Sequence, residues 1–310
     1  MDRAVTTFGP TTPRSALARA ARRKRVLVAY LFLLPFLVPF LLLWVAPIVE
    51  GLYLGFTNSS LLEPESRFVG LDNYRRLVSD TTFRESLGNT LVFVVENVPI
   101  LMIAGLVLAL MLNEPLHGRA AIRGAFVAPY LITGSAVAIA WQFMLNPTTG
   151  ILNRWLGSAD LPTQRWLNEP GQAMWVVTAI TLWWRVGFPL LVILAALQDV
   201  PQDLYEAAKI DGASAFQRFR SITLPLITPV LIFVLIIRLI DSFKVFAQVY
   251  LVTEGGPFGS TRVVLQYLYE RGFQDYQTGY AAAIGWMLFL IILIVTLIQL
   301  VVLRRVETYD

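Results

Sequence analysis

The sequence predicts an all-α membrane protein that crosses the bilayer with six helices. Of its 310 residues, 56% are hydrophobic and only 15% are charged, whereas soluble domains carry about 25% charged residues. Six separate stretches hold enough apolar residues to cross about 30 Å of hydrocarbon, which takes about 20 residues of helix. Helices are expected because lipid offers no hydrogen-bond partner to the backbone.

The six predicted spans are not equally strong. The fourth carries Arg185 near its middle, and the fifth begins with Pro225 and Pro229. Both are kept, because dropping either would leave a segment rich in Leu, Ile and Val in water. The spans are expected at residues 26–48, 90–112, 124–145, 173–197, 222–240 and 281–303.

Basic residues set the expected orientation of a single transmembrane domain at residues 26–303. Six of them lie at residues 14–25, directly before the first span, so the tail at residues 1–25 is expected in the cytoplasm. Six crossings return residues 304–310 to the same side. The segments placed in the cytoplasm hold 14 of the 25 Lys and Arg residues, and the longer external loops hold 9. Basic charge therefore follows topology, which argues against a nucleic-acid partner. No small-residue cleavage site follows the first span, and the span is too long for the core of a signal peptide, so we expect an uncleaved helix surrounded by membrane lipid.

Several kinds of chemistry lack the residues that they need. The chain has no cysteine and one histidine, His117, so no metal site and no catalytic set are expected, and we do not expect an enzyme. None of the three lysines lies in a Gly-rich phosphate loop. Energy for transport would then come from a partner ATPase or from an ion gradient, although only Glu96 offers a carboxylate well within a span for a proton relay.

The link at residues 198–221, expected in the cytoplasm, predicts two short helices joined by a turn. Pro201 begins a run of good helix formers, Asp211 and Gly212 end that run, and Ser214 can cap a second helix. From the residues alone, such a loop either rests on its own bundle or enters a groove of a partner.

This loop resembles the EAA motif of binding-protein-dependent ABC importer permeases. The matching residues are Glu206-Ala207-Ala208, Asp211-Gly212-Ala213, Phe219, Ile222 and Leu224-Pro225. The resemblance implies that the loop is the coupling helix that contacts a separate ATPase dimer, with coupling residues Glu206, Ala207, Ala208, Asp211, Gly212, Ala213 and Phe219. It also implies that ATP and Mg²⁺ are bound by that dimer and that this chain binds no cofactor.

Other stretches resemble the first permease of carbohydrate importers related to the maltose and glycerol-3-phosphate systems. They are residues 68–74, 89–90, 251–257 and 279–283. The resemblance implies a multi-pass protein of the bacterial cell membrane that transports a sugar, polyol or glycerophosphate. Its implied partners are a second, similar permease, the ATPase dimer and an extracytoplasmic solute-binding protein. The chain lacks the extra spans and large external insertion of the maltose system's large subunit, which favours a compact six-span form.

Polar and aromatic residues inside the spans are candidates for the solute pathway. A central Arg costs about 2.5–3.5 kcal/mol on insertion scales, so such groups normally face protein or water. Flat Trp faces suit the C–H faces of sugar rings. The candidates are Glu96, Asn97, Trp141, Gln142, Trp183, Trp184, Arg185, Arg238 and Asp241. The alternatives are that the tryptophans serve packing or the lipid interface, that Arg185 pairs with Glu96, and that Arg238 pairs with Asp241.

Overall fold

The computed structural model describes residues 28–63, 65–115 and 117–307. The basic tail predicted at residues 1–25 lies outside this range. The chain divides into two units between Tyr53 and Leu54. In the first, a helix starting at Val28 passes through η1 (Leu41–Val45) and continues as α2 (Ala46–Leu54). None of its described residues is buried, and such an apolar helix is accommodated by lipid rather than by water.

The second unit consists of helices and connecting loops. One isolated antiparallel bridge, between Thr57 and Phe68, is the exception among the described residues. The helices are α3 (Asp72–Ser79), α4 (Thr81–Asn113), α5 (Arg119–Val127), η2 (Ala128–Leu131), α6 (Gly134–Met144), α7 (Ile151–Ser158), α8 (Pro170–Arg185), α9 (Gly187–Asp199), α10 (Gln202–Ile210), α11 (Ala215–Arg218), η3 (Phe219–Thr223), α12 (Leu224–Phe243), α13 (Ala247–Val252), α14 (Val264–Tyr269), η4 (Glu270–Gln274) and α15 (Thr278–Glu307).

Four helices of the described chain are long and apolar enough to cross a bilayer. They are Val28–Leu54, Thr81–Asn113, Ala215–Phe243 and Thr278–Val301, and two bent helix pairs raise the number to six if each pair is one span. The prediction of an all-helical, polytopic membrane fold is confirmed.

The third and fourth predicted spans are broken rather than continuous. α5 with η2 meets α6 at a bend of 101°, and α8 meets α9 at a bend of 47°. In the first pair, Pro129 lies in the 3₁₀ turn and Thr133 is extended before α6. In the second, Gly187 lies so close to the end of α5 that an added Cβ would come within 2.8 Å of the carbonyl oxygen of Phe126. Proline and close backbone packing create such breaks. A hydropathy average over a whole span does not detect them, so each broken pair was predicted as one continuous helix.

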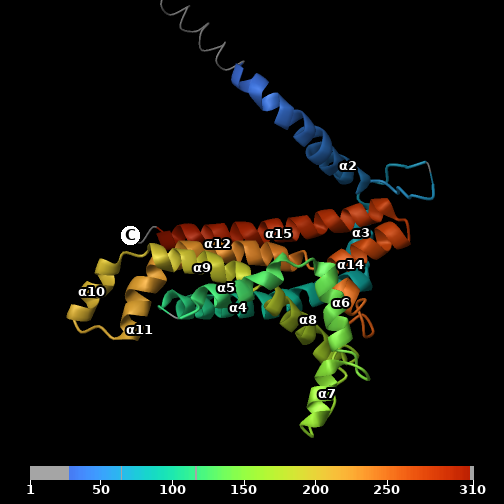
Figure 1. The fold of residues 1–310 in the computed structure, drawn as a ribbon. Helices are drawn as coiled ribbons and strands as arrows, with labels where there is room; N and C mark the ends of the chain where they lie inside the picture. The colour runs from blue at the N-terminus through green and yellow to red at the C-terminus, as the bar shows by residue number, and fades with distance from the viewer. Residues whose placement is uncertain (1–27, 64, 116, 308–310) are drawn as a thin grey trace, which may run out of the picture. The chain divides into compact units, whose positions relative to one another are not determined.

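α4 is the central helix of the second unit and packs against α8, α9 and α12 (Figure 1). Its contact with α9 is especially close at Gly105, where an added Cβ would come within 2.7 Å of Pro189 Cβ. Small residues permit this approach between helices. The buried residues of α4 recur every three or four positions, as expected of one helix face; they include Phe93, Asn97, Leu101, Gly105, Ala109 and Leu112.

The loops of the second unit gather at two opposite ends of the long helices. α10 and α11 lie at one end, and α3 and α14 lie at the other (Figure 1). Two backbone hydrogen bonds fasten the latter end: the amide of Gly279 donates to Ser59 over 2.9 Å, and that of Leu61 donates to Tyr276 over 3.1 Å.

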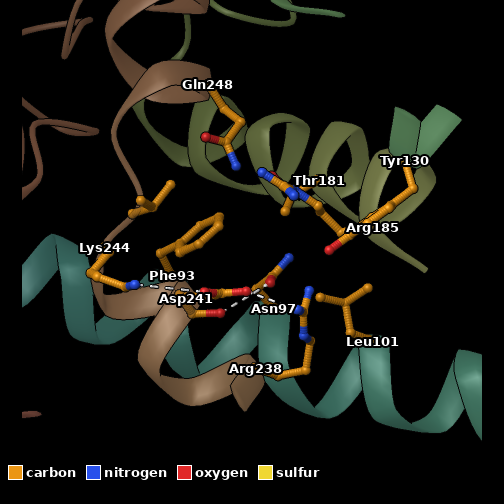
Figure 2. A pocket seen from close by; sticks show the side chains of 12 residues that line it. Phe93, Asn97, Leu101, Tyr130, Thr181, Arg185, Arg238, Asp241, Lys244 and Gln248 are labelled. Atoms are coloured by element: carbon orange, nitrogen blue, oxygen red, sulfur yellow. Dashed lines mark hydrogen bonds and ion pairs between the residues drawn. The ribbon is translucent and has the colours of Figure 1, made fainter. Parts of the chain in front are cut away.

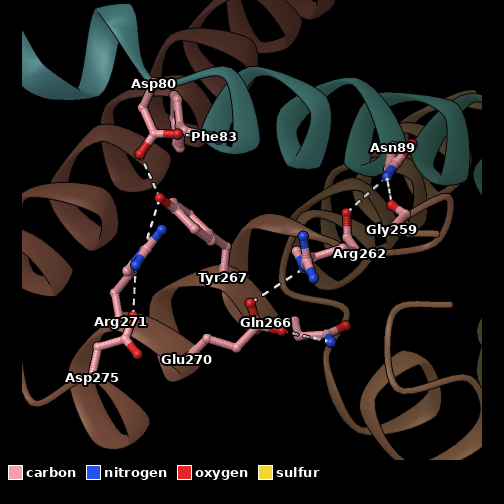
Figure 3. A network of polar contacts seen from close by, with 10 residues as sticks. All are labelled: Asp80, Phe83, Asn89, Gly259, Arg262, Gln266, Tyr267, Glu270, Arg271 and Asp275. Atoms are coloured by element: carbon pink, nitrogen blue, oxygen red, sulfur yellow. Dashed lines mark hydrogen bonds and ion pairs between the residues drawn. The ribbon is translucent and has the colours of Figure 1, made fainter.

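A carboxylate ties together the helices at the α3–α14 end (Figure 3). Asp80 caps α4 by accepting from the amide of Phe83 at 3.1 Å, and it also accepts from the hydroxyls of Tyr267 and, at 2.6 Å, Tyr280. Arg271 in turn donates to the Tyr267 hydroxyl at 2.9 Å. Burial alone would raise the pKa of the Asp80 carboxyl, but these donors outweigh burial and hold that pKa below its ordinary value.

Gly105→Ala is expected to lower the melting temperature of the purified protein. The added methyl group overpacks the α4–α9 contact, at a cost of about 1–3 kcal/mol. Gly88→Ala is the matched control, because it lies on the same helix and nothing lies within 4 Å of its added Cβ. Thermal unfolding in detergent measures both, and equal melting temperatures would contradict the close contact.

Asp80→Asn is expected to lower the free energy of unfolding at pH 7 by about 1–3 kcal/mol, because charge-assisted hydrogen bonds are lost. The folded pKa of Asp80 is lowered, so its contribution is complete above the ordinary value of 3.8 and is lost as the pH falls through the folded value. The deficit of the variant should therefore shrink in acid.

Melting curves from pH 7 downward measure this difference. Asp72→Asn is the control, because Asp72 forms an exposed ion pair with Arg75, and such pairs contribute about 0–1 kcal/mol. A deficit of Asp80→Asn that stays constant with pH would contradict the assigned role.

Candidate functional site

A cavity of about 370 Å³ lies among α4, η2, α8, α12 and α13 (Figure 2). This size falls within the range of small-molecule sites, about 300–1,000 Å³. Its lining mixes charged, amide, hydroxyl and apolar side chains. The residues are Phe93, Asn97, Leu101, Tyr130, Thr181, Arg185, Arg238, Asp241, Ser242, Lys244, Val245 and Gln248.

Helical spacing brings these side chains to the cavity. α4 supplies Phe93, Asn97 and Leu101, which lie one turn apart, and α8 supplies Thr181 and Arg185 with the same spacing. Residues four apart occupy one helix face. Each helix therefore presents a row of side chains, and the two rows line the same space (Figure 2).

At the end of α12, Arg238 and Asp241 form an ion pair with an Nη2–Oδ2 distance of 2.7 Å. The Arg238 side chain is 3% exposed and that of Asp241 is 46% exposed. Lys244 lies 3.8 Å from the other oxygen of the same carboxylate. The pairing three residues apart, one of the alternatives raised by the sequence, is confirmed. Both residues of the pair also line the cavity.

Arg185 lies against aromatic rings. Its Cζ is 3.7 Å from the centroid of the Trp184 ring and 5.4 Å from that of Tyr130. Trp184 is fixed by a hydrogen bond from Nε1 to the carbonyl of Ile132 at 3.1 Å. The alternative that Arg185 pairs with Glu96 is wrong for the described structure, because Glu96 instead accepts from the Thr178 hydroxyl at 3.1 Å and does not line the cavity.

The other candidates from the sequence lie elsewhere. Trp184 is buried and packs in a core cluster, and Trp141 contacts Trp183 edge to face with centroids 5.6 Å apart. Trp183 borders an apolar pocket between α5 and α8. Gln142 lines a separate cavity of about 440 Å³ beside Tyr250 and Glu254. Of the nine candidates, the cavity brings together Asn97, Arg185, Arg238 and Asp241.

Several residues that line the cavity were not among the candidates predicted from the sequence. Tyr130 lies at the break of the third span, and Lys244 and Gln248 follow the expected end of the fifth span at residue 240, so hydropathy gives no sign of them. Thr181 could have been found, because it lies one helical turn before Arg185.

The loop with the EAA motif has the predicted helix–turn–helix form. α10 ends at a turn in which Gly212 has a φ of +76°, a conformation that favours glycine. Ser214 then caps α11 in a capping box. The backbone amide of Gln217 donates to Ser214 Oγ at 3.3 Å, and the backbone amide of Ser214 donates to Gln217 Oε1 at 2.7 Å. The second helix is not a separate short element: α11 continues through the π-helical η3 into α12, so that one helix runs from Ala215 to Phe243.

The face of this loop is largely open. No residue of α10 is buried, and Glu206, Ala207, Asp211 and Gly212 are exposed. Ala208, Ala213 and Phe219 are half-buried. The apolar side chain of Ile210 at the end of α10 is 86% exposed. A contact from the Tyr205 hydroxyl to the Thr223 hydroxyl, 2.9 Å long, joins α10 to η3.

Asp241→Asn is expected to destabilise the protein by about 3–5 kcal/mol at most, because it leaves the buried Arg238 without its carboxylate. Lys244→Gln is the control: its contact with Asp241 is longer and more exposed, so a loss of about 0–1 kcal/mol is expected. Thermal unfolding in detergent checks both variants. Similar losses of stability in the two variants would contradict the larger contribution assigned to the Arg238–Asp241 pair.

Comparison with known proteins identifies the family. Residues 82–308, from α4 to the end of α15, match the family described as "Binding-protein-dependent transport system inner membrane component". The chain is 38% identical over 279 residues to the trehalose/maltose transport system permease protein MalF of Thermococcus litoralis, covering 89% of this chain and 94% of that one. It is 35% identical over 274 residues to the arabinooligosaccharides transport system permease protein AraP of Bacillus subtilis, covering 87% of each.

A solved structure is similar as well. A chain of the bacterial alginate ABC transporter in complex with alginate pentasaccharide-bound periplasmic protein superposes with a TM-score of 0.81, at 27% identity, over 91% of this chain and 96% of that chain. The matched region contains both the cavity and the loop with the EAA motif. The chain therefore belongs to the inner membrane components of binding-protein-dependent transport systems, as a multi-pass permease subunit of an ABC importer and not an enzyme.

Proposed function

We propose that this chain forms half of the translocation pathway for a sugar or a related polyol or glycerophosphate solute. The observation that carries the proposal is the polar cavity of Figure 2, enclosed by helices that the family comparison covers. Relatives are named for trehalose/maltose and for arabinooligosaccharides, and the similar solved transporter is described with an alginate pentasaccharide. These names point to carbohydrates as the solute class.

The neutral lining of the cavity supports a solute rich in hydroxyl groups. Asn97 and Gln248 offer amides, and Thr181 and Ser242 offer hydroxyls. Each of these groups can both donate and accept hydrogen bonds, as sugar hydroxyls do. Thr181 already donates to the carbonyl of Val177 at 2.8 Å and Ser242 to Asn97 Oδ1 at 3.3 Å, whereas Asn97 Nδ2 has no hydrogen-bond partner in the described structure. Buried polar groups without a partner are costly, and a solute hydroxyl would accept from this amide.

The energy for transport would come from a separate ATPase dimer that binds ATP and Mg²⁺, while this chain binds no cofactor. The open face of α10, with Glu206 and Gly212 among its exposed positions, supports a contact with that dimer. The residues proposed for this contact are Glu206, Ala207, Ala208, Asp211, Gly212, Ala213 and Phe219.

One helix connects this loop to the cavity. Ala215–Phe243 is continuous over 29 residues, which corresponds to about 43 Å, and it carries Arg238 and Asp241 near its far end. The Tyr205–Thr223 contact attaches α10 to this helix. Movement of α10 by the ATPase would thus displace the cavity lining and switch the access of the cavity between the two sides.

The remaining partners follow from the same proposal. A second, similar permease would complete the pathway, and a solute-binding protein would deliver the solute at the α3–α14 end. The similar solved transporter is described in complex with a periplasmic protein. In this proposed arrangement both termini and α10 lie in the cytoplasm. The distribution of basic residues supports it, because the predicted cytoplasmic segments hold 14 of the 25 Lys and Arg residues.

Deleting the chain from its native cell tests the proposed function. Uptake of labelled sugars that depends on the binding protein should disappear and should return with the wild-type chain. Uptake by proteoliposomes of the complete complex should require ATP. Uptake by the purified chain alone, driven by a proton or sodium gradient without ATP, would instead establish an ion-coupled carrier.

Gly212→Pro is expected to abolish co-purification of the ATPase with the tagged chain, while the second permease is retained. Proline cannot adopt the φ of +76° found at Gly212. Gly118→Pro is the matched control, because Gly118 has a φ of +75° and the same open surroundings in the other short link. Glu206→Ala removes a charge without changing the backbone and is expected to weaken the association. Full retention of the ATPase by both loop variants would refute the coupling role.

A further inference from the structure

We propose that the cavity of Figure 2 takes a solute that carries an anionic group, a carboxylate or a phosphate ester, in addition to its hydroxyls. The inference rests on the proposed function and narrows its solute class to acidic sugars and to phosphate esters of sugars or polyols. It follows from the balance of charge in the cavity lining and from the surroundings of Arg185.

The lining holds more positive than negative charge. Arg185, Arg238 and Lys244 are cationic, whereas Asp241 is the only carboxylate among the lining residues. Asp241 is shared, because Arg238 contacts one of its oxygens at 2.7 Å and Lys244 approaches the other at 3.8 Å. Three cations against one carboxylate leave the cavity with an excess of two positive charges.

Arg185 accounts for much of this excess. No ion pair involving Arg185 occurs in the described part of the chain, and its guanidinium is held by the faces of Trp184 and Tyr130. Rings held in this way orient the guanidinium without neutralising its charge. Glu96, which could have neutralised it, is directed to Thr178 instead.

An unneutralised cation inside a bundle is costly, and such residues usually line a pathway. A guanidinium binds carboxylate or phosphate oxygens through two parallel hydrogen bonds, which are stronger than bonds to neutral hydroxyls. An anionic solute group would therefore remove much of the cost, whereas a neutral sugar would leave the charge in place.

The neighbours of Arg185 suit the rest of such a solute. The Thr181 hydroxyl lies one turn away on α8 and lines the same cavity. Asn97 is buried, and its Nδ2 has no hydrogen-bond partner in the described structure. An anionic group at Arg185 and hydroxyls at these neutral groups would satisfy both kinds of lining residue.

Initial uptake rates in cells that contain the complete transport system test this inference. The probes are pairs matched in length: digalacturonate with digalactose for the carboxylate, and sn-glycerol 3-phosphate with glycerol for the phosphate. In the wild type, at least one anionic member should be taken up about tenfold faster than its neutral partner at equal concentration. The pair of probes that shows the preference identifies which anionic group, carboxylate or phosphate, the cavity binds.

Arg185→Gln should raise the apparent KM for the preferred anionic probe by about 10- to 100-fold, because the charge-assisted hydrogen bonds are lost. Arg185→Lys retains the charge and should recover part of the affinity. Arg119→Gln is the control, since Arg119 is exposed and is not among the cavity lining residues. Rates are normalised to the amount of assembled complex, so that a loss of folded complex does not appear as a fall in the maximal rate; the apparent KM does not depend on that amount.

Three results would overturn the inference. Uptake of neutral members alone by the wild type would reject it while leaving the proposed function intact. An unchanged KM for the anionic probe in Arg185→Gln, or an equal fall of both members of a pair, would show that Arg185 only packs against its aromatic neighbours. Uptake of neither anionic probe by cells that take up another labelled sugar through the complete system would reject the inference and leave the proposed function intact.

Discussion

The close approach of α4 to α9 is the contact on which the rest of the second unit depends. Gly105 lets Pro189 come near because it has no side chain, and small residues at such contacts replace the hydrophobic drive that lipid does not provide. Once α9 lies against α4, the bend at Gly187 directs α8 so that Arg185 faces the same cavity as Asn97 of α4. The position of the cavity is thus a consequence of backbone packing.

α12 joins the loop with the EAA motif to the cavity. Its uninterrupted continuation from α11 begins beside the open α10 helix and ends with the Arg238–Asp241 pair. In the proposed mechanism, a displacement of α10 would reach the cavity along this helix. The tie at Asp80 fastens the opposite end, where α4 begins close to α14 and α15.

Some parts of the molecule could be predicted from the sequence and others could not. The apolar stretches within α4 and α15, and the helix–turn–helix form of residues 198–221, could be predicted because length, hydropathy and capping residues are local properties. The breaks near Thr133 and Gly187 could not, because they depend on which backbone packs against which. The role of the tryptophan candidates could not be predicted for a similar reason: a Trp within a span is compatible with packing or with a solute face, and only its neighbours distinguish the two.

A helical membrane protein without cysteine, and with a loop typical of ABC importer permeases, could be predicted from the residues alone, because composition and motif spacing do not depend on how the helices are arranged. The pairing of Asp241 with both Arg238 and Lys244 is a property of the folded chain. So is the packing of the Arg185 guanidinium on the Trp184 ring, with no ion pair to a carboxylate in the described part of the chain. The physical reason is that charge balance in a cavity is a property of side chains from several helices, whose distances no single stretch of sequence contains.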